Sequence, residues 1–322
     1  MAAKAILSDA PAILLSVVWI LELGKIMANS IDGNSTEPTE RKTLIFGCGY
    51  LGKEIGRQLV RIGDNVWGST RCRENGKKLS NMGINPIISD WNDPRTLSKL
   101  DSFSHVVIAV SRGRNAQKSY WETLVGGLNL LLPRLSGAEN VVYISSTGVY
   151  HQKNGVWVDE TSPTHPTRQS AKAHLAAENL IRRKRSSSSW NVLRLAGIYG
   201  FERVPNQQQL RKRIPIQADP NSYINLIHVE DAAQAVIAAL GNSNQRTYVV
   251  SDDQPTQRRD YYSFITKHLG LAEPIFTTEG TSDSKLPRSE GNKRVWNRRM
   301  KRELLPKLRY PTHVEGLPPL LK

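Results

Sequence analysis

The sequence predicts an α/β fold, a doubly wound and mostly parallel sheet with helices on both faces and a smaller C-terminal substrate lobe. Three observations predict it. Short apolar segments alternate with helical patterns from Thr43 to Leu240, and a glycine-rich loop directly follows the first of these segments. After Gly200, a polar stretch with several prolines and basic residues interrupts the alternation. A chain of 322 residues has room for one large domain with such a lobe.

The first strand, the loop after it and the first helix are predicted from Thr43 onward. Thr43–Phe46 is apolar and partly β-branched, and the pattern GxGxxG follows at once over Gly47–Gly52. Leu51, Ile55 and Leu59 then recur every four residues, as in a helix with one buried stripe. A strand, a glycine loop and a helix in this order form the dinucleotide-binding fingerprint, which indicates a Rossmann-type domain.

Each residue type in the loop has a physical reason to be there. Gly47 permits the tight turn, Gly49 lets backbone amides approach a pyrophosphate, and Gly52 lets the helix pack closely against the strand. The helix N-terminus, where Tyr50 and Leu51 lie, supplies a partial positive charge. We therefore expect these five residues to bind the dinucleotide.

The end of the second strand favours one form of the cofactor. Asn65–Gly68 is followed by Ser69, Thr70 and Arg71, at the place where an NAD-specific site usually carries an acid for the ribose 2′-hydroxyl. An acid would repel a 2′-phosphate, whereas Arg71 or Arg73 can pair with one. Thr70 and Arg71 therefore favour NADP over NAD, and an ordinary surface arginine is the alternative.

The remaining strands follow in order. Pro86–Asp90 reads as the third strand, with Asp90 at its C-terminal end where it could contact the adenine side. His105–Val110 reads as the fourth, and Ala109 and Val110 at its end are expected to contact the cofactor. Further strands are expected at Val141–Tyr150, where the strand runs into a turn of small residues, at Trp190–Leu195, and at Tyr223–His228 and Thr247–Val250, where the chain returns to the sheet.

Several motifs beyond the glycine loop resemble those of the extended short-chain dehydrogenases/reductases, the family of nucleotide-sugar epimerases and dehydratases. They are Val141–Tyr150, Asp159–Pro163, Ala176–Glu178, Leu193–Gly200, Asn225–Asp231 and, in the tail, Asn292–Arg294, Tyr310–Thr312 and Glu315–Leu317. The resemblance covers nearly everything after residue 42. It implies a nicotinamide cofactor and an oxidoreductase or epimerase that acts on a polar, sugar-like small molecule.

The sequence departs from this family at the catalytic pair. In the family, a Ser or Thr on the fifth strand positions the substrate oxygen, and Tyr-x-x-x-Lys on the next helix carries the proton chemistry. Ser146 matches the first position. Counting back from Ala176–Glu178 places Ser170 at the tyrosine position and His174 at the lysine position. An aliphatic hydroxyl ionises far outside the range of a phenol, so Ser170 cannot replace the tyrosine alone.

Other groups are candidates for the proton chemistry. His174 could act as acid or base itself, or could take a proton from Ser170, with which it shares a helix face. Tyr150, just after the serine turn, is a further candidate, and packing is the alternative for it. The loss of both usual residues also leaves a second hypothesis open, a cofactor-binding regulator or sensor without catalysis. We expect Asp231 to cap a helix over Ala232–Leu240.

These assignments divide the chain into three parts. Residues 1–41 are expected to be an N-terminal extension or linker, 42–200 and 222–252 the NAD(P)-binding Rossmann domain, and 201–221 and 253–322 the substrate lobe. The apolar segment Ala10–Leu21 is too short to span a bilayer. A weak secretory signal and a start of translation at Met27 are alternatives for the first residues, and the second is preferred.

Charge and cysteine content exclude other functions. The formal charge is +15, with basic runs that mostly read as solvated helix faces, at Arg182–Arg185, Arg211–Arg213, Arg258–Arg259 and Lys293–Arg302. No nucleic-acid-binding module accompanies them, so binding to nucleic acid is not expected. Cys48 and Cys72 provide neither a disulfide framework nor metal-ligand spacing, so we expect no metal and a reducing, cytoplasmic compartment. The oligomeric state stays open, and a homodimer is one option.

Overall fold

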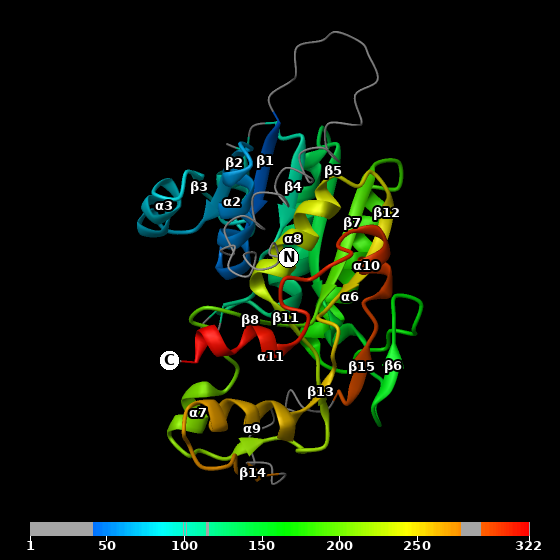
Figure 1. Ribbon diagram of the computed structural model, residues 1–322. Coiled ribbons are helices and arrows are strands. Elements are labelled where there is room, and N and C mark those ends of the chain that lie inside the picture. Colours follow the sequence, from blue (N-terminus) through cyan, green and yellow to red (C-terminus); the bar gives the residue numbers. More distant parts are fainter. Residues whose placement is uncertain (1–40, 99, 101, 114–115, 278–290, 322) are drawn as a thin grey trace, which may run out of the picture.

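The computed structural model describes residues 41–321 except 99, 101, 114–115 and 278–290, so the predicted N-terminal extension lies almost wholly outside the described residues. A seven-stranded sheet forms the centre (Figure 1), in the order β12-β7-β5-β4-β1-β2-β3. Every neighbouring pair in it is parallel, which confirms the predicted Rossmann-type fold. Its strands are β1 (Lys42–Phe46), β2 (Asn65–Thr70), β3 (Asn85–Ile88), β4 (His105–Ile108), β5 (Asn140–Ser146), β7 (Ser189–Leu195) and β12 (Gln245–Val250).

Helices cover both faces of this sheet, and the inner strands such as β4 and β5 are buried on both faces for that reason. On one face, α2 (Tyr50–Arg61) and α8 (Val229–Leu240) pack together over side chains such as Ile45. On the other, a π-helical turn (Glu122–Gly126), α5 (Gly127–Leu131) and α6 (Gln169–Lys184) cover side chains such as Leu44. The short helices α3 (Arg73–Ser80) and α4 (Pro94–Leu97) follow β2 and β3.

The expectation that the segment 223–228 returns to the central sheet is wrong. The segment splits into β10 (Tyr223–Ile224), antiparallel to β13 (Thr256–Gln257), and β11 (Leu226–His228), parallel to β8 (Gly197–Tyr199). Both edges of β7 are already paired, with β5 and with β12, so no position beside it is free. Asn225, between the two pieces, donates from its side chain to the carbonyl of Lys293.

The smaller lobe lies beyond the C-terminal ends of the central strands (Figure 1). Its elements are α7 (Gln207–Arg211), α9 (Arg258–His268), and β9 (Ile216–Gln217), which pairs in parallel with β14 (Phe276–Thr277). A core of its own holds it together, and Leu210, Ile216, Tyr261 and Ile265 are among its buried side chains.

The tail of the chain ties the lobe back to the sheet. β15 (Lys293–Val295) pairs in parallel with β6 (Val156–Val158), and α10 (Arg298–Glu303) packs against β12. The last helix, α11 (His313–Gly316), contacts β11 and is followed by the turn Pro318–Leu320.

The start of α8 differs from the expectation. The helix begins three residues earlier than predicted, at Val229, and the residue that caps it is His228, whose Nδ1 accepts from the Glu230 amide at 3.3 Å. Asp231 is therefore inside the first turn. Its carboxylate instead accepts from the backbone amides of Arg309 and Tyr310, at 2.7 and 2.9 Å, and so anchors the tail.

Candidate functional site

The glycine loop lies tightly against the end of β4. Gly47 has φ +93°, and a Cβ there would come within 2.8 Å of the Val110 amide nitrogen and 2.9 Å of the Ala109 carbonyl carbon. A Cβ on Gly52 would lie 2.8 Å from the Gly47 oxygen. Because both positions exclude a side chain, the glycines do the steric work expected of them. The structure thus brings Gly47 and Gly52 together with Ala109 and Val110.

The space in front of Gly49 is open. Among the described residues, a Cβ at this position would meet no atom within 4 Å, and no side chain caps the helix that begins at Tyr50. The loop itself is fixed from behind, because the Gly47 amide donates to the Ser69 hydroxyl at 2.8 Å and the Cys48 amide to the Ser69 carbonyl. Uncapped amides at the N-terminus of a 12-residue helix, facing open space, suit the pyrophosphate of a dinucleotide.

The residues predicted to contact the adenosine ribose lie at the same C-terminal edge of the sheet as the glycine loop. Thr70 ends β2, and Arg71 after it is exposed, with no hydrogen bond or ion pair to any residue that the structure describes. The guanidinium extends toward the loop after β4, since a Cβ on Gly113 would lie 3.8 Å from Arg71 Nη2. Asp90 lies two residues beyond β3, where its Oδ1 accepts from the Asn92 amide at 3.0 Å.

Tyr50 and Leu51 use their side chains for structure. The Tyr50 hydroxyl donates to the Phe201 carbonyl at 3.0 Å, and the guanidinium of Arg203 lies over the tyrosine ring. Burial raises the pKa of Tyr50 to about 12. Leu51 is in the core beneath α2. A contact of these two residues with a cofactor would therefore be made by their backbone, while Tyr50 links the glycine loop to the lobe.

The predicted catalytic residues do not form one connected group. Ser146 ends β5 and is half-buried, and its Oγ accepts from the Gly148 amide at 3.0 Å. His174 turns toward the sheet, with Nδ1 3.2 Å from the buried Tyr143 hydroxyl, and burial lowers the pKa of His174. Among the described residues, no hydrogen bond joins His174 to Ser170, which lies one turn away near the start of α6.

Tyr150 belongs to a buried charge network that the sequence analysis missed. Its hydroxyl accepts from Arg194 Nη1 at 2.9 Å, and burial raises its pKa to about 12. Arg194 also pairs with Glu178 at 2.8 Å, and Ser145 donates to that carboxylate at 2.6 Å. The network joins α6 to β5 and β7. The signal was present, because Glu178 and Arg194 are the charged residues of two otherwise apolar motifs.

Two residues of the basic runs, which were expected to be mostly solvated, are buried. Arg185 is 5 % exposed and donates to the carbonyls of Leu135 and Ala138, so it closes the end of α6. Lys293 is 7 % exposed, on β15. A strand alternates its faces, so one residue of a basic run can point inward while the next stays outside.

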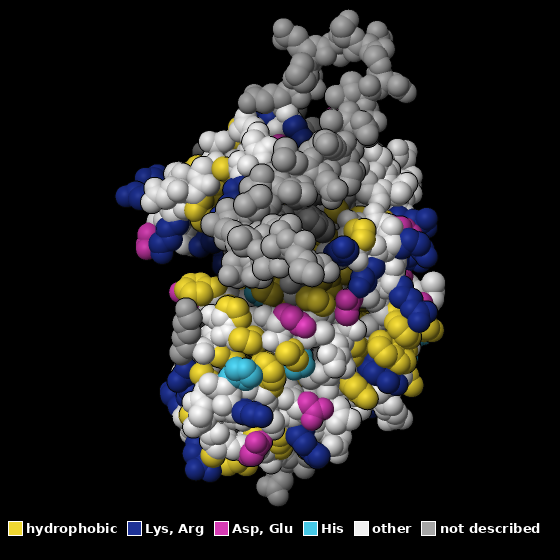
Figure 2. All heavy atoms as spheres, in the orientation of Figure 1, with side chains coloured by type: hydrophobic (Ala, Val, Ile, Leu, Met, Phe, Trp, Pro, Cys, Tyr) yellow, Lys and Arg dark blue, Asp and Glu magenta, His cyan; other side chains and the backbone are white. Residues whose placement is uncertain are grey.

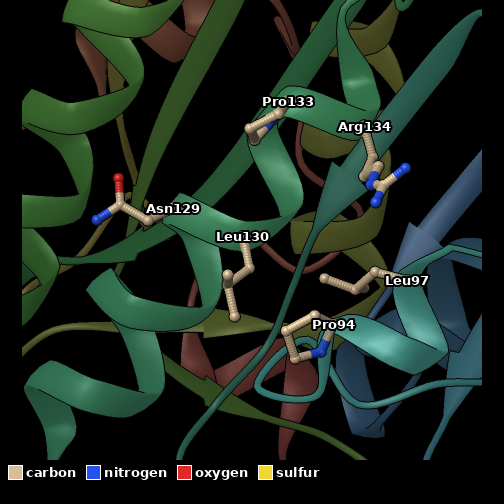
Figure 3. A pocket seen from close by; sticks show the side chains of 6 residues that line it. All are labelled: Pro94, Leu97, Asn129, Leu130, Pro133 and Arg134. Atoms are coloured by element: carbon tan, nitrogen blue, oxygen red, sulfur yellow. The ribbon is translucent and has the colours of Figure 1, made fainter.

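A hollow of about 320 Å³ lies elsewhere, between α4 and α5 (Figure 3). It is lined by Pro94, Leu97, Asn129, Leu130, Pro133 and Arg134, and none of these is a candidate site residue. The described part of the chain contains no cluster of potential metal ligands. None of its helices is long and apolar enough to cross a membrane.

Similar proteins share this fold and part of the sequence. Protein y4nG of Sinorhizobium fredii, which is uncharacterised, is 25% identical over 71% of this chain and 60% of its own length. The decarboxylating sterol-4-alpha-carboxylate 3-dehydrogenase of Dictyostelium discoideum is 23% identical over 71% of this chain and 76% of its own. This chain thus spans less than two thirds of y4nG.

Solved structures agree over most of both chains. A Methylobacillus flagellatus protein assigned to the NAD-dependent epimerases/dehydratases is 30% identical, with a TM-score of 0.70 over 88% of this chain and 98% of that one. The UDP-glucose 4-epimerase of Thermotoga maritima shares the fold at 17% identity, with a TM-score of 0.72 over 87% and 97%. The model of the NAD dependent epimerase/dehydratase family matches residues 43–251, from the first strand past the last strand of the central sheet. Fold, glycine loop and this match agree, and the chain belongs to the NAD-dependent epimerase/dehydratase family.

Proposed function

We propose that this protein binds NADP(H) and acts as an oxidoreductase or epimerase on a polar, sugar-like small molecule. The open space before Gly49, at an uncapped helix N-terminus, carries the proposal. Related folds support the substrate class, since MoeE5 was solved with UDP-glucose and NAD, and the Thermotoga maritima enzyme with UDP-glucose. Arg71 supports NADP, because it is exposed and unpaired within the described residues beside the predicted ribose site.

Two residues have defined roles in this proposal. The nicotinamide ring would supply hydride transfer. Arg71 would pair with the 2′-phosphate. Ser146 would orient the reacting oxygen, because its Oγ accepts from the Gly148 amide and its own O–H remains to donate to a carbonyl.

The structure also favours a second candidate, a cofactor-binding sensor without turnover. The hydroxyl of Tyr150 is held by Arg194, and His174 faces the buried Tyr143. Within the described residues, no hydrogen bond links the side chain of Tyr150 or of His174 to Ser170. Such a protein would keep the glycine loop, while its titratable side chains form hydrogen bonds in the interior. Its conformation would then respond to the cofactor concentration without any turnover.

Calorimetric titration of the full chain with NADPH and with NADH, at fixed salt, tests the cofactor. We expect NADPH to bind more tightly. The variant Arg71→Ala should weaken NADPH binding by roughly tenfold or more while NADH binding hardly changes, because one charge-assisted pair with the 2′-phosphate is lost. Equal affinities for the two cofactors would refute the NADP preference, and no binding of either would refute the proposed function.

Turnover separates the two candidates. The NADPH- and NAD⁺-loaded protein would be incubated with a panel of UDP-sugars, with wild type and Ser146→Ala side by side. Turnover that falls in Ser146→Ala, with cofactor affinity unchanged, supports the enzyme. Turnover that survives in Ser146→Ala would remove Ser146 from the site.

A further inference from the structure

The turn after β8 brings an arginine of the lobe segment to the glycine loop. Two backbone hydrogen bonds close this turn, because the amides of Gly200 and Arg203 each donate to the other's carbonyl, at 3.2 and 2.9 Å. From the turn, the guanidinium of Arg203 extends over the ring of Tyr50, 5.1 Å from the ring centroid. The Tyr50 hydroxyl donates to the Phe201 carbonyl at 3.0 Å, so the turn contacts the start of α2 at two points.

The charge of Arg203 is not used by another residue of the described chain. Its side chain is exposed, and within the described residues it forms no ion pair and donates no hydrogen bond. Three carboxylates act on the Tyr50 hydroxyl nearby. Those of Glu54 and Glu230 pair with other arginines. Glu202, exposed on the turn itself, forms no ion pair with Arg203.

The backbone of Tyr50 belongs to the part of the loop where a dinucleotide is expected. Tyr50 and Leu51 open α2, and neither of their amides donates a hydrogen bond to a described residue. A pyrophosphate carries about two negative charges, whereas a helix N-terminus supplies only about half a positive one. Amides alone therefore leave most of that charge unbalanced, and a nearby cation would be needed to balance it.

We propose that Arg203, from the lobe segment, binds the pyrophosphate of the cofactor. This inference rests on the proposed function and adds a ligand that the glycine loop does not contain. The guanidinium fork matches the geometry of phosphate oxygens. Its present contact with Tyr50 is an exposed cation–π contact, which is weak enough to be exchanged for a charged partner. Because Arg203 lies on the turn that leads into the lobe, a bound cofactor would hold this segment against the loop.

Calorimetric titration of the full chain with NADPH and with NADH, at fixed salt, separates this contact from that of Arg71. Both cofactors contain the pyrophosphate, and only NADPH has the 2′-phosphate. We expect Arg203→Met to weaken the binding of both by the same factor, roughly tenfold or more, whereas Arg71→Ala weakens NADPH alone. Arg203→Lys should recover part of the affinity, because the charge remains without the fork.

The control is Arg183→Met, which removes the same charge from an exposed position of α6 and should bind both cofactors like wild type. An equal loss in the control would overturn the proposal, since net charge rather than contact would then set the affinity. Wild-type affinity in Arg203→Met would also overturn it, as would a loss confined to NADPH. If wild type binds neither cofactor, the proposed function fails and this inference with it, whereas the other outcomes refute Arg203 alone.

Hydrogen exchange gives a second measurement that does not depend on affinity. At saturating NADH, the backbone amides of residues 200–206 should exchange more slowly in wild type, because the turn is then held by the cofactor. In Arg203→Met, also saturated with NADH, the same amides should exchange as they do without cofactor. Equal slowing in the two proteins would contradict the role of Arg203, and circular dichroism of both checks that the substitution leaves the fold intact.

Discussion

At three positions of the glycine loop, the room for one Cβ atom decides what a residue can do. Gly47 and Gly52 have none, because the end of β4 and the loop's own backbone lie within 3 Å of a Cβ there. Gly49 has room, because no atom in the described part of the chain would lie within 4 Å of a Cβ there. A side chain at Gly47 or Gly52 would disturb the fold, whereas one at Gly49 would occupy only the space that a pyrophosphate needs.

We therefore predict that Gly49→Val abolishes NADPH binding while the protein stays folded. Calorimetry measures the binding, and thermal unfolding followed by circular dichroism measures the fold. Gly137→Val is the matched control, because a Cβ at Gly137 also meets nothing within 4 Å and the position is remote in sequence from the loop. Unaltered NADPH affinity in Gly49→Val would place the cofactor elsewhere.

Single residues also show where sequence patterns stop being informative. The glycine roles at Gly47 and Gly52 follow from a local motif, and the structure agrees with them. The partners of His174 and Tyr150 cannot be found from a local motif. Tyr143 is 31 residues from His174, and Arg194 is 44 residues from Tyr150. A helical pattern shows which residues share a face, but the face that turns inward is set by tertiary packing.

At the scale of elements, α8 depends on a histidine as its cap. His228 is 3 % exposed, its Nδ1 accepts the Glu230 amide, and its ring packs against Tyr199 and Tyr310. Only a neutral ring can accept that hydrogen bond. Burial, with the nearby charge of Arg309, lowers the pKa of His228 to about 4.

This cap predicts a loss of stability in acid. The unfolded chain takes up the proton near the ordinary histidine pKa of about 6.5 and the folded chain only near 4, so the free energy of unfolding falls as the pH drops through this window. We expect His228 to account for up to about 3 kcal/mol of the fall. His228→Asn keeps a cap that cannot titrate.

Urea unfolding of wild type and His228→Asn, at about pH 7 and about pH 4.5, measures the effect. At the lower pH, the free energy of unfolding of wild type should fall by more than that of His228→Asn. Asp231, whose pKa burial raises to about 6, changes stability in the opposite direction but is common to both proteins. Parallel pH dependences of the two proteins would show that His228 does not titrate in this window.

Elements also mark the limit of the sequence-based prediction of the fold. All seven central strands were predicted within a few residues. Strands such as β4 are buried and form continuous apolar runs, whereas the edge strand β3 is largely exposed. The segment 223–228 has a similar pattern but forms two short pairings instead. The pattern reports burial, whereas the pairing partner depends on which strand edges are already occupied.

For the molecule as a whole, Lys293 should lower stability at neutral pH. Its pKa is about 8 in the folded chain and 10.5 in the unfolded chain, so below pH 8 the folded state carries an unfavourable charge. We predict that Lys293→Met raises the free energy of unfolding by up to about 3 kcal/mol at neutral pH. The advantage should shrink between pH 8 and 10.5, as wild-type folded protein loses the proton first.

Urea unfolding at about pH 7 and about pH 9.5 checks this prediction, with Lys267→Met, the same substitution at an exposed position of α9, as the control. If Lys293→Met is no more stable than wild type at neutral pH, another group must stabilise the charge of Lys293 in the folded protein. Sequence alone could not have identified this residue, because it belongs to a run of basic residues and only strand pairing turns it inward. The predicted division into domain and lobe remains a prediction, and α10 shows that part of the tail packs on the central sheet.

The pairing of β6 with β15 brings two indoles together. Trp157 and Trp296 stack with ring centroids 3.9 Å apart, and both strands lie at the edge of the molecule, where hydrophobic and basic side chains are exposed (Figure 2). Indoles this close couple their electronic transitions, which gives a split circular dichroism band that single tryptophans lack. The chain therefore contains an optical reporter of a contact between segments 139 residues apart, and Lys293 begins one of the two strands that form it.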